Sequence, residues 1–137
     1  MSKRTTVLWL LGLLAASVLV VLMAVKYSNR LYFDSSGVAH GTGTKHYHYQ
    51  SGQLKQEDRY VDGVLVEETW YRPDGTVFAN ETFVDGCGVG YYLREDGSPR
   101  VKMPYVNGLA EGTVTYYSTN GEIERTAEFK AGQEVKN

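Results

Sequence analysis

Residues 60–86 contain Tyr60-Val61-Asp62-Gly63, then Trp70-Tyr71-Arg72-Pro73-Asp74-Gly75, then Phe83-Val84-Asp85-Gly86. The rest of the chain after residue 40 repeats the pattern of this stretch. An aromatic residue leads into an Asp-Gly turn, a strand-like run follows, and an aromatic pair leads into the next Asp-Gly turn. Sliding the 137-residue sequence along itself aligns eight glycines in two registers at steps of 22 to 24 residues: Gly52, Gly75, Gly97 and Gly121, and Gly63, Gly86, Gly108 and Gly132. This periodicity identifies a repeat protein.

The residues before these glycines predict turns. Six of the eight glycines follow Asp or Asn, and Asp-Gly and Asn-Gly tolerate positive φ at both central positions, as a type I′ hairpin turn requires. A reversal every 11 to 13 residues leaves room for one short strand and its turn, but not for a helix and its connection. We therefore predict an all-β fold, an elongated antiparallel meander. Its expected strands are 44–50, 54–60, 65–71, 77–83, 89–94, 100–105, 112–117 and 123–129, with a ninth at 133–136.

Two sets of aromatic residues follow this register. One aromatic stands eight residues after each first-register glycine, and alternation along the strands predicts that these four stack as a ladder on one face: Tyr60, Phe83, Tyr105 and Phe129. The opposite face of the same strands is charged. The intervening strands end in aromatic pairs, with His48-Tyr49 as a degenerate first copy: Trp70-Tyr71, Tyr91-Tyr92 and Tyr116-Tyr117.

The aromatic pairs supply the candidate binding residues. Adjacent strand residues point to opposite faces, so one member of each pair is expected to join the ladder and the other to face outward. Outward Trp and Tyr side chains in a row are typical of an interface. The alternative is that both members of each pair pack internally.

The first 25 residues differ from the repeats. Val7 to Val25 is a run of 19 uncharged, mostly apolar residues, which predicts a transmembrane helix. Residues 1–25 are thus expected to form a membrane anchor, residues 26–43 a juxtamembrane linker, and residues 44–137 the repeat domain. The alternative is a cleaved signal peptide after Ala24, although Leu22 is large for the position three residues before such a cut. Replacement of Gly37 by Ala in the linker is expected to cost almost nothing.

The net charge after the apolar run narrows the range of expected binding partners. Two of the 14 Lys and Arg residues precede the apolar run, which leaves 12 against 16 Asp and Glu residues and a net charge of −4 after it. This charge disfavours nucleic acid as a partner. The slight basic excess before the run predicts that the repeat domain lies outside the cytoplasm, in the periplasm of a Gram-negative source.

The combination of an aromatic residue, Asp/Asn-Gly, Tyr-Tyr and a further Asn/Asp-Gly resembles the MORN repeat, in particular the variant found in bacterial proteins. Four units cover about residues 40 to 133 and end at Gly63, Gly86, Gly108 and Gly132. The resemblance implies an elongated twisted β-meander that serves as a binding or scaffolding module, and it implies no catalysis. Some bacterial members carry an antitoxin label.

The sequence predicts no active site, cofactor or metal. Cys87 has no His partner placed near it, and Glu67 and Glu68 are adjacent and so face opposite sides of a strand. His46 and His48 share a strand face, which suits a metal, but no third ligand lies nearby in sequence. We therefore expect a non-catalytic, membrane-anchored module that binds a protein partner. The alternatives are an antitoxin-like protein, and a glycan or cell-wall binder that stacks sugars on the outward aromatics.

Overall fold

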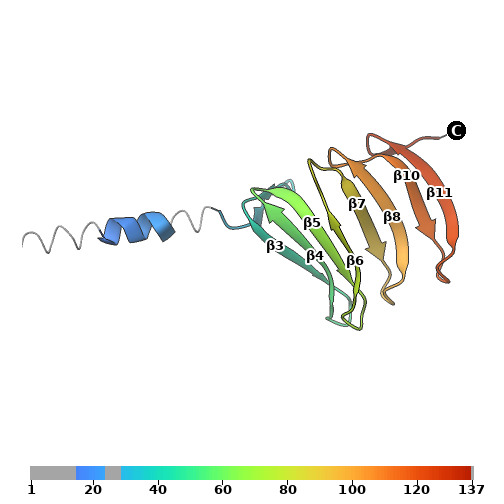
Figure 1. The fold of residues 1–137 in the computed structure, drawn as a ribbon, viewed down its shortest axis with the longest axis horizontal. Helices are drawn as coiled ribbons and strands as arrows, with labels where there is room; N and C mark the ends of the chain where they lie inside the picture. Colours follow the sequence, from blue (N-terminus) through green and yellow to red (C-terminus); the bar gives the residue numbers. More distant parts are fainter. Residues whose placement is uncertain (1–14, 24–28, 137) are drawn as a thin grey trace, which may run out of the picture.

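The computed structural model describes residues 15–23 and 29–136. Eight strands of six or eight residues carry the fold: β3 (Gly43–His48), β4 (Leu54–Val61), β5 (Val64–Tyr71), β6 (Val77–Thr82), β7 (Gly88–Leu93), β8 (Pro99–Val106), β10 (Gly112–Tyr117) and β11 (Ile123–Lys130). Four two-residue strands complete it: β1 (Tyr32–Phe33), β2 (Ala39–His40), β9 (Leu109–Ala110) and β12 (Gln133–Glu134). The strands follow one another side by side in chain order (Figure 1), and the ladders between them are antiparallel, so the predicted all-β meander is confirmed.

Four hairpins repeat along this row. Unit 1 is β3–β4, unit 2 is β5–β6, unit 3 is β7–β8 and unit 4 is β10–β11. Each hairpin has a register shift at the same place, opposite the end of its first strand. A β-bulge at a fixed position increases the local twist, which suits the curvature of the row (Figure 1).

The two glycine registers form different turns. Asp62, Asp85, Asn107 and Ala131 have positive φ together with the glycines that follow them, as in type I′ turns. In the other register only the glycine has positive φ. There, for example, the Gly75 amide donates to the Arg72 carbonyl at 2.9 Å and the Arg72 amide donates to the Thr76 carbonyl at 2.8 Å. This is a three-residue loop, so the prediction of positive φ at both central residues was wrong for this register.

The Asp and Asn residues of the three-residue loops act as side-chain hydrogen-bond acceptors. Asp74 Oδ1 accepts from the amide and the hydroxyl of Thr76, at 2.9 and 2.6 Å. Asp96 Oδ1 makes the same pair of contacts with Ser98. These residues are therefore suited to the loop by a side-chain acceptor rather than by tolerance of positive φ.

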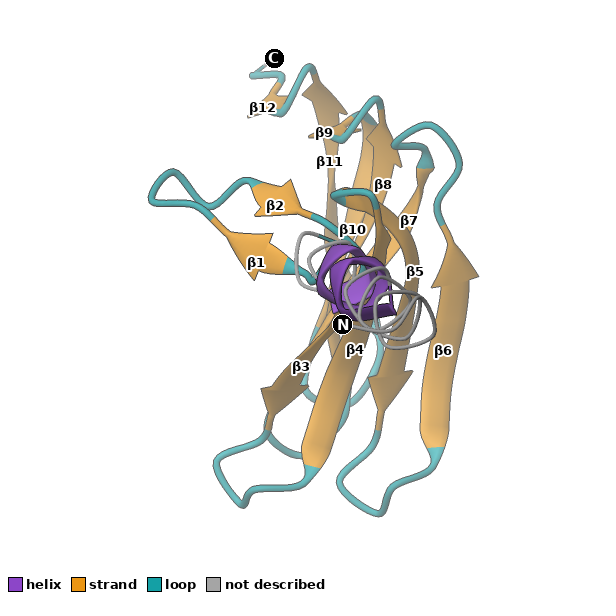
Figure 2. Cartoon of the chain, turned by 90° about the vertical axis from the view of Figure 1, so that its left-hand side faces the viewer, coloured by secondary structure: helices purple, strands orange, loops and turns teal. Residues whose placement is uncertain are grey.

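The segment expected to be a linker contains the β1–β2 hairpin, which projects to one side of the row (Figure 2). Its loop repeats the three-residue geometry: the Gly37 amide donates to the Asp34 carbonyl, and Gly37 has a φ of +82°. The expectation that Gly37 tolerates Ala at almost no cost was therefore wrong. The Phe33 ring packs edge-on against Tyr60, so this hairpin covers part of unit 1.

Residues 15–23 form a helix whose side chains are exposed. The remainder of the predicted transmembrane span, 7–14 and 24–25, lies outside the described residues. Among the residues that the structure describes, no helix is both long and apolar enough to cross a membrane.

The row of strands is divided between units 2 and 3. β4 and β5 pair over six positions from Gln56 to Val61, so units 1 and 2 share one sheet. β6 and β7 share only the bridge between Val84 and Cys87, and units 3 and 4 form a second sheet with β9 and β12. Side chains bridge the division instead, since the Tyr91 ring contacts both Trp70 and Phe78 at centroid distances of 5.2 and 5.4 Å.

The core is thin and lies along one side of the strands. Trp70 is 1% exposed and Val114 is 0% exposed, and smaller contributions come from Tyr49, Phe83, Leu93 and Ala110. Loop side chains also join successive units: the Tyr49 hydroxyl donates to the Tyr71 carbonyl at 2.6 Å, and Arg94 donates to the Tyr117 carbonyl. Such nearest-neighbour contacts are the ones that hold a repeat array together.

Candidate binding site

One face of the strands, here called the pocket face, carries a cross-strand pair at the same position in every unit. These pairs are Lys45–Asp58 in unit 1, Glu68–Glu81 in unit 2, Gly90–Met103 in unit 3 and Val114–Ala127 in unit 4. The first two units therefore place charged residues where the last two place apolar ones. The repeat position is a core position in units 3 and 4, because Val114, Gly90 and their neighbours are buried or half-buried.

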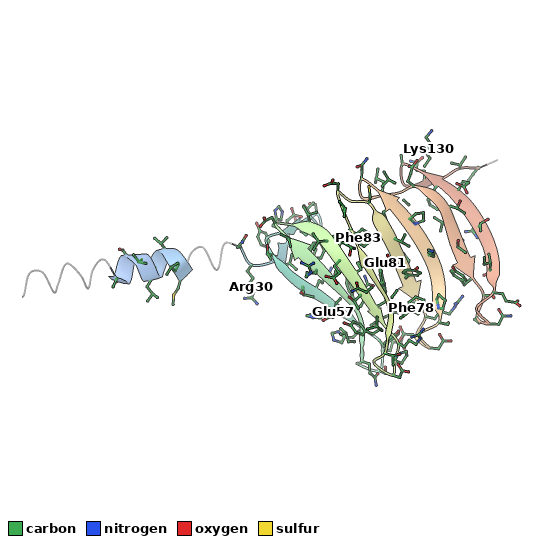
Figure 3. All side chains as sticks on the ribbon, viewed as in Figure 1. Arg30, Glu57, Phe78, Glu81, Phe83 and Lys130 are labelled. Atoms are coloured by element: carbon green, nitrogen blue, oxygen red, sulfur yellow. The ribbon has the colours of Figure 1, made fainter. Side chains whose placement is uncertain are left out.

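A cavity of about 590 Å³, here called the junction cavity, opens on the pocket face where the two sheets separate. Unit 2 contributes Leu65 and Glu68, both on β5, and the second sheet contributes Tyr105. Phe83, which follows β6 (Figure 3), also lines the cavity. The rest of its lining comes from type I′ turns and a strand start: Gly63, Val64, Asp85, Gly86, Asn107 and Gly108.

The turn backbones explain why the cavity lies at this junction. Elsewhere a backbone hydrogen bond connects a type I′ turn to the turn or strand before it, from the Gly108 amide to the Gly86 carbonyl at 2.8 Å and from the Gly132 amide to the Ala110 carbonyl of β9 at 2.9 Å. Among the described residues, no such bond joins the Gly63 turn to the Gly86 turn. The missing bond and the divided sheet leave the space that the cavity occupies.

Glycines in β7 bring aromatic rings into the cavity wall. A Cβ on Gly88 would lie 2.6 Å from the Phe83 ring, and one on Gly90 would lie 2.9 Å from the Tyr105 ring. The two rings are 6.3 Å apart and tilted by 56°. β7 thus needs small residues at these positions, because the rings lie directly against its backbone.

Glu68 is the half-buried carboxyl group of this cavity. Burial, followed by the nearby charge of Asp58, raises its pKa from 4.5 to about 8. Its side chain has no hydrogen bond or ion pair to any other described residue. Asp58, 4% exposed, also has a pKa raised by burial, although Gln56 Nε2 donates to its Oδ1 at 2.7 Å.

Two further hollows continue the pocket face on either side of Tyr92. One, of about 440 Å³, is lined by Tyr47, His48, Lys55, Gln56, Asp58, Glu68, Tyr92 and Leu93. The other, of about 280 Å³, is lined by Tyr92, Arg100, Val101, Met103 and Tyr116. Glu68 is shared by the first of these hollows and the junction cavity, and the Tyr92 hydroxyl lies 3.3 Å from that of Tyr105. The three hollows therefore adjoin one another along the pocket face, and together they are here called the groove.

The predicted aromatic row does not form a uniform surface. Trp70 is buried, and its Nε1 has no hydrogen-bond partner within the described part of the chain. Tyr91 packs at the junction, and Tyr71 donates to Glu57, which together with burial raises the Tyr71 pKa to about 12. Tyr117 is half-buried.

Tyr92 and Tyr116 of the predicted row do line the groove, together with Tyr47, which sequence reasoning missed. Counting back five residues from each first-register glycine gives Tyr47, Trp70, Tyr92 and Tyr116. The pairing of Tyr91-Tyr92 with Trp70-Tyr71 was therefore displaced by one residue, and the glycine spacing was the signal that could have corrected it.

The predicted ladder is present in part. Phe83 and Tyr105 are in contact, but Tyr60 packs against Phe33, and within the described residues no ring contact joins Tyr105 to Phe129. Phe83 follows β6 and Tyr105 lies in β8, so this ladder contact crosses the division between the two sheets.

The other candidate residues have local partners. His46 Nε2 lies 3.0 Å from Glu57 Oε1, and His40 Nε2 lies 3.0 Å from Asp34 Oδ2. Cys87 is exposed beside the Asp85-Gly86 turn. Within residues 15–23 and 29–136, no group of three His, Cys, Asp or Glu side chains is placed to hold a metal ion.

Comparison with known proteins identifies one segment. Residues 110–131, which contain β10, its loop and β11, match the family model of the MORN repeat variant. The chain carries a MORN repeat variant. Units 1 to 3 have the same paired strands, bulge and loop as this MORN unit, so the structure extends its geometry to the segments before it. No curated protein and no solved structure matches the chain.

Proposed function

We propose that this protein is a non-catalytic module, anchored in a membrane by its N-terminal segment, that binds a protein partner through the groove on the pocket face. The MORN repeat variant in residues 110–131 supports a repeat module without catalytic machinery. Repeat arrays commonly offer one extended surface built from equivalent positions of successive units.

The observation that carries the proposal is the extension of the groove across all four units. Tyr92 stands at its centre, 52% exposed, with hollows on both sides. A large, rigid aromatic side chain between depressions suits a protein interface, since Tyr buries much area on binding and loses little conformational entropy.

The proposed anchor has support in the N-terminal sequence and helix. The run from Val7 to Val25 is long enough to span a hydrocarbon core of roughly 30 Å if all of it is helical. Six successive apolar residues, Val18 to Met23, are each more than half exposed, so every side of this helical stretch is apolar. An environment of lipid would satisfy such a helix better than water.

Site-specific photocrosslinking in cells tests the binding function. A photoreactive amino acid at Arg100, which lines the groove beside Tyr92, should give a discrete higher-mass product. The double variant Tyr92→Ser/Tyr116→Ser should lose that product and remain folded. The matched control is a photoreactive residue at Tyr32, an aromatic residue on β1 that is about as exposed as Tyr92. Products of equal yield at both positions, or none at Arg100, would contradict the proposal.

The proposed location has its own test. A reporter fused after Asn137 should be active outside the cytoplasm, and the fusion should remain with membranes after an alkaline wash. Cytoplasmic reporter activity would reverse the orientation and remove the envelope from the proposal.

A further inference from the structure

The position of Glu68 is unfavourable for the free protein. Its equivalents in units 3 and 4 are Gly90 and Val114, both buried. Glu68 also has an acidic residue directly opposite on each neighbouring strand, Asp58 on β4 and Glu81 on β6. Like charges directly opposite one another destabilise a sheet. A residue that opposes both the repeat pattern and its cross-strand neighbours is a candidate for a role in binding.

The charges around the junction cavity are of one sign. Its charged lining residues are Glu68 and Asp85, and its remaining lining is apolar, aromatic or backbone, apart from Asn107. Two cations of the neighbouring strands already have partners: Lys45 Nζ lies 4.3 Å from the centre of the Phe33 ring, and Lys55 Nζ lies 3.3 Å from Glu95 Oε1. The cavity is thus aromatic, and its ionisable lining groups are acidic, with Glu68 charged above its raised pKa of about 8.

We propose that the junction cavity receives the side chain of a Lys or Arg residue of the protein partner, with its cationic head at Glu68 and its aliphatic stem along the cavity-lining surfaces of Phe83 and Tyr105. This inference rests on the proposed binding function. A carboxylate beside aromatic faces is the combination that recognises ammonium and guanidinium groups. The bound cation would neutralise the acidic cross-strand positions, and the apolar stem would pack on the parts of the Phe83 and Tyr105 rings that line the cavity.

A peptide titration tests the proposal directly. The probe is the acetylated and amidated tripeptide Gly-Arg-Gly, added to the ¹⁵N-labelled full chain in neutral detergent micelles at pH 8.5 and followed by backbone amide shifts. The amides of Gly86, Gly88 and Gly108, which border the cavity, should shift and saturate. The Lys peptide should act similarly. The citrulline peptide, which has nearly the same shape but no charge, should cause shifts at least tenfold weaker.

Variants assign the effect to the cavity. Glu68→Gln should weaken binding of the Arg peptide at least tenfold. The matched control is Glu67→Gln, since Glu67 is the adjacent carboxylate, faces the other side of β5 and pairs with Arg59. Equal affinity for the Arg and citrulline peptides, or equal weakening by both substitutions, would overturn the inference.

The two proposals can fail separately. If Glu68→Gln leaves the Arg100 crosslink unchanged while Tyr92→Ser/Tyr116→Ser removes it, the groove binds a protein, but the proposal that a cationic side chain occupies the junction cavity is wrong. If both sets of substitutions leave that crosslink unchanged, the proposed binding function fails as well. Arg-peptide binding that competes with the crosslink supports both.

Discussion

The first two hairpin units and the last two have the same backbone and opposite chemistry on the pocket face. Val114 and Ala127 of unit 4 form a cross-strand pair in which Val114 is fully buried. The equivalent pair in unit 2 is Glu68–Glu81, of which Glu68 lines a cavity instead of a core. The comparison shows that units with the same hairpins and turns can carry either a packed apolar pair or an acidic pair beside a cavity at this one position.

The junctions between successive units also differ from one another. Units 1 and 2 continue one sheet through six paired positions, while units 2 and 3 meet through aromatic rings around Tyr91. The hydrogen-bonded junction is closed, and the side-chain junction leaves room for a ligand.

The largest expected effect comes from moving the unit 2 residue into unit 4. Val114→Glu should lower the free energy of unfolding by about 4 kcal/mol or more, because it buries a carboxyl group without a partner. Chemical denaturation measures this loss. The control Val114→Ala should cost about 2 kcal/mol, the loss for a smaller cavity. Equal losses for the two variants would mean that unit 4 does not differ from unit 2 at this position.

A second contrast lies between Trp70 and Tyr92, which occupy equivalent positions in units 2 and 3. Trp70→Ala should cost about 3 to 5 kcal/mol, because the ring is fully buried at the junction. Tyr92→Ala should cost about 1 kcal/mol or less, since half of that side chain is exposed. Urea unfolding of both variants tests this. A similar cost for both would show that Tyr92 is also a core residue.

The pH dependence of stability should distinguish the acidic units. The pKa of Glu68 is raised, so its protonated form is favoured in the folded state, and stability falls as pH rises from its unfolded pKa of 4.5 through about 8. With discounting for partial solvent exposure, the fall is on the order of 2 kcal/mol. Glu68→Gln should therefore match the wild-type protein below pH 4.5 and exceed its stability at pH 9. Superimposable stability curves across this range would show that Glu68 is solvated.

Much of this fold could be predicted from the sequence, because Asp-Gly and Asn-Gly turns act locally. The strand between Gly63 and Gly75, for example, needed only its two bounding turns and its length. The division between β6 and β7 could not be predicted, since the turn at Asp85-Gly86 is of the same type as the one at Asp62-Gly63.

The site was only partly predictable. The sequence analysis excluded Glu67 and Glu68 as an acid–base pair and gave Glu68 no other role. What distinguishes Glu68 is its position in the repeat. Aligning the chain by its glycines places Glu68 with Lys45, Gly90 and Val114, and that alignment is visible in the sequence. The cavity beside it depends on how two sheets meet and has no local signal.

The smallest predicted loss of stability concerns the three-residue loops of the β5–β6 and β1–β2 hairpins, which lie outside the cavity. Gly75→Ala and Gly37→Ala should each cost about 1 kcal/mol, because both glycines have positive φ and open space around the added methyl group. Thermal or chemical unfolding measures Gly75→Ala, and hydrogen exchange at Val38 reports the β1–β2 hairpin for Gly37→Ala. Unchanged exchange at Val38 would restore the description of residues 26–43 as a plain linker.

The most direct test of the difference between the acidic and apolar units is the pKa of Glu68 itself. A ¹³C-detected NMR titration of the side-chain carboxyl groups resolves Glu68 from Glu67, its neighbour on the other side of β5. The structure predicts a pKa of about 8 for Glu68, raised by burial, and a value below 4.5 for Glu67, lowered first by its hydrogen bond from Asn80 and then by that from Arg59. A Glu68 pKa near 4.5 would contradict the account, because the carboxyl group would then lie in open solvent rather than in a desolvated cavity between the two sheets.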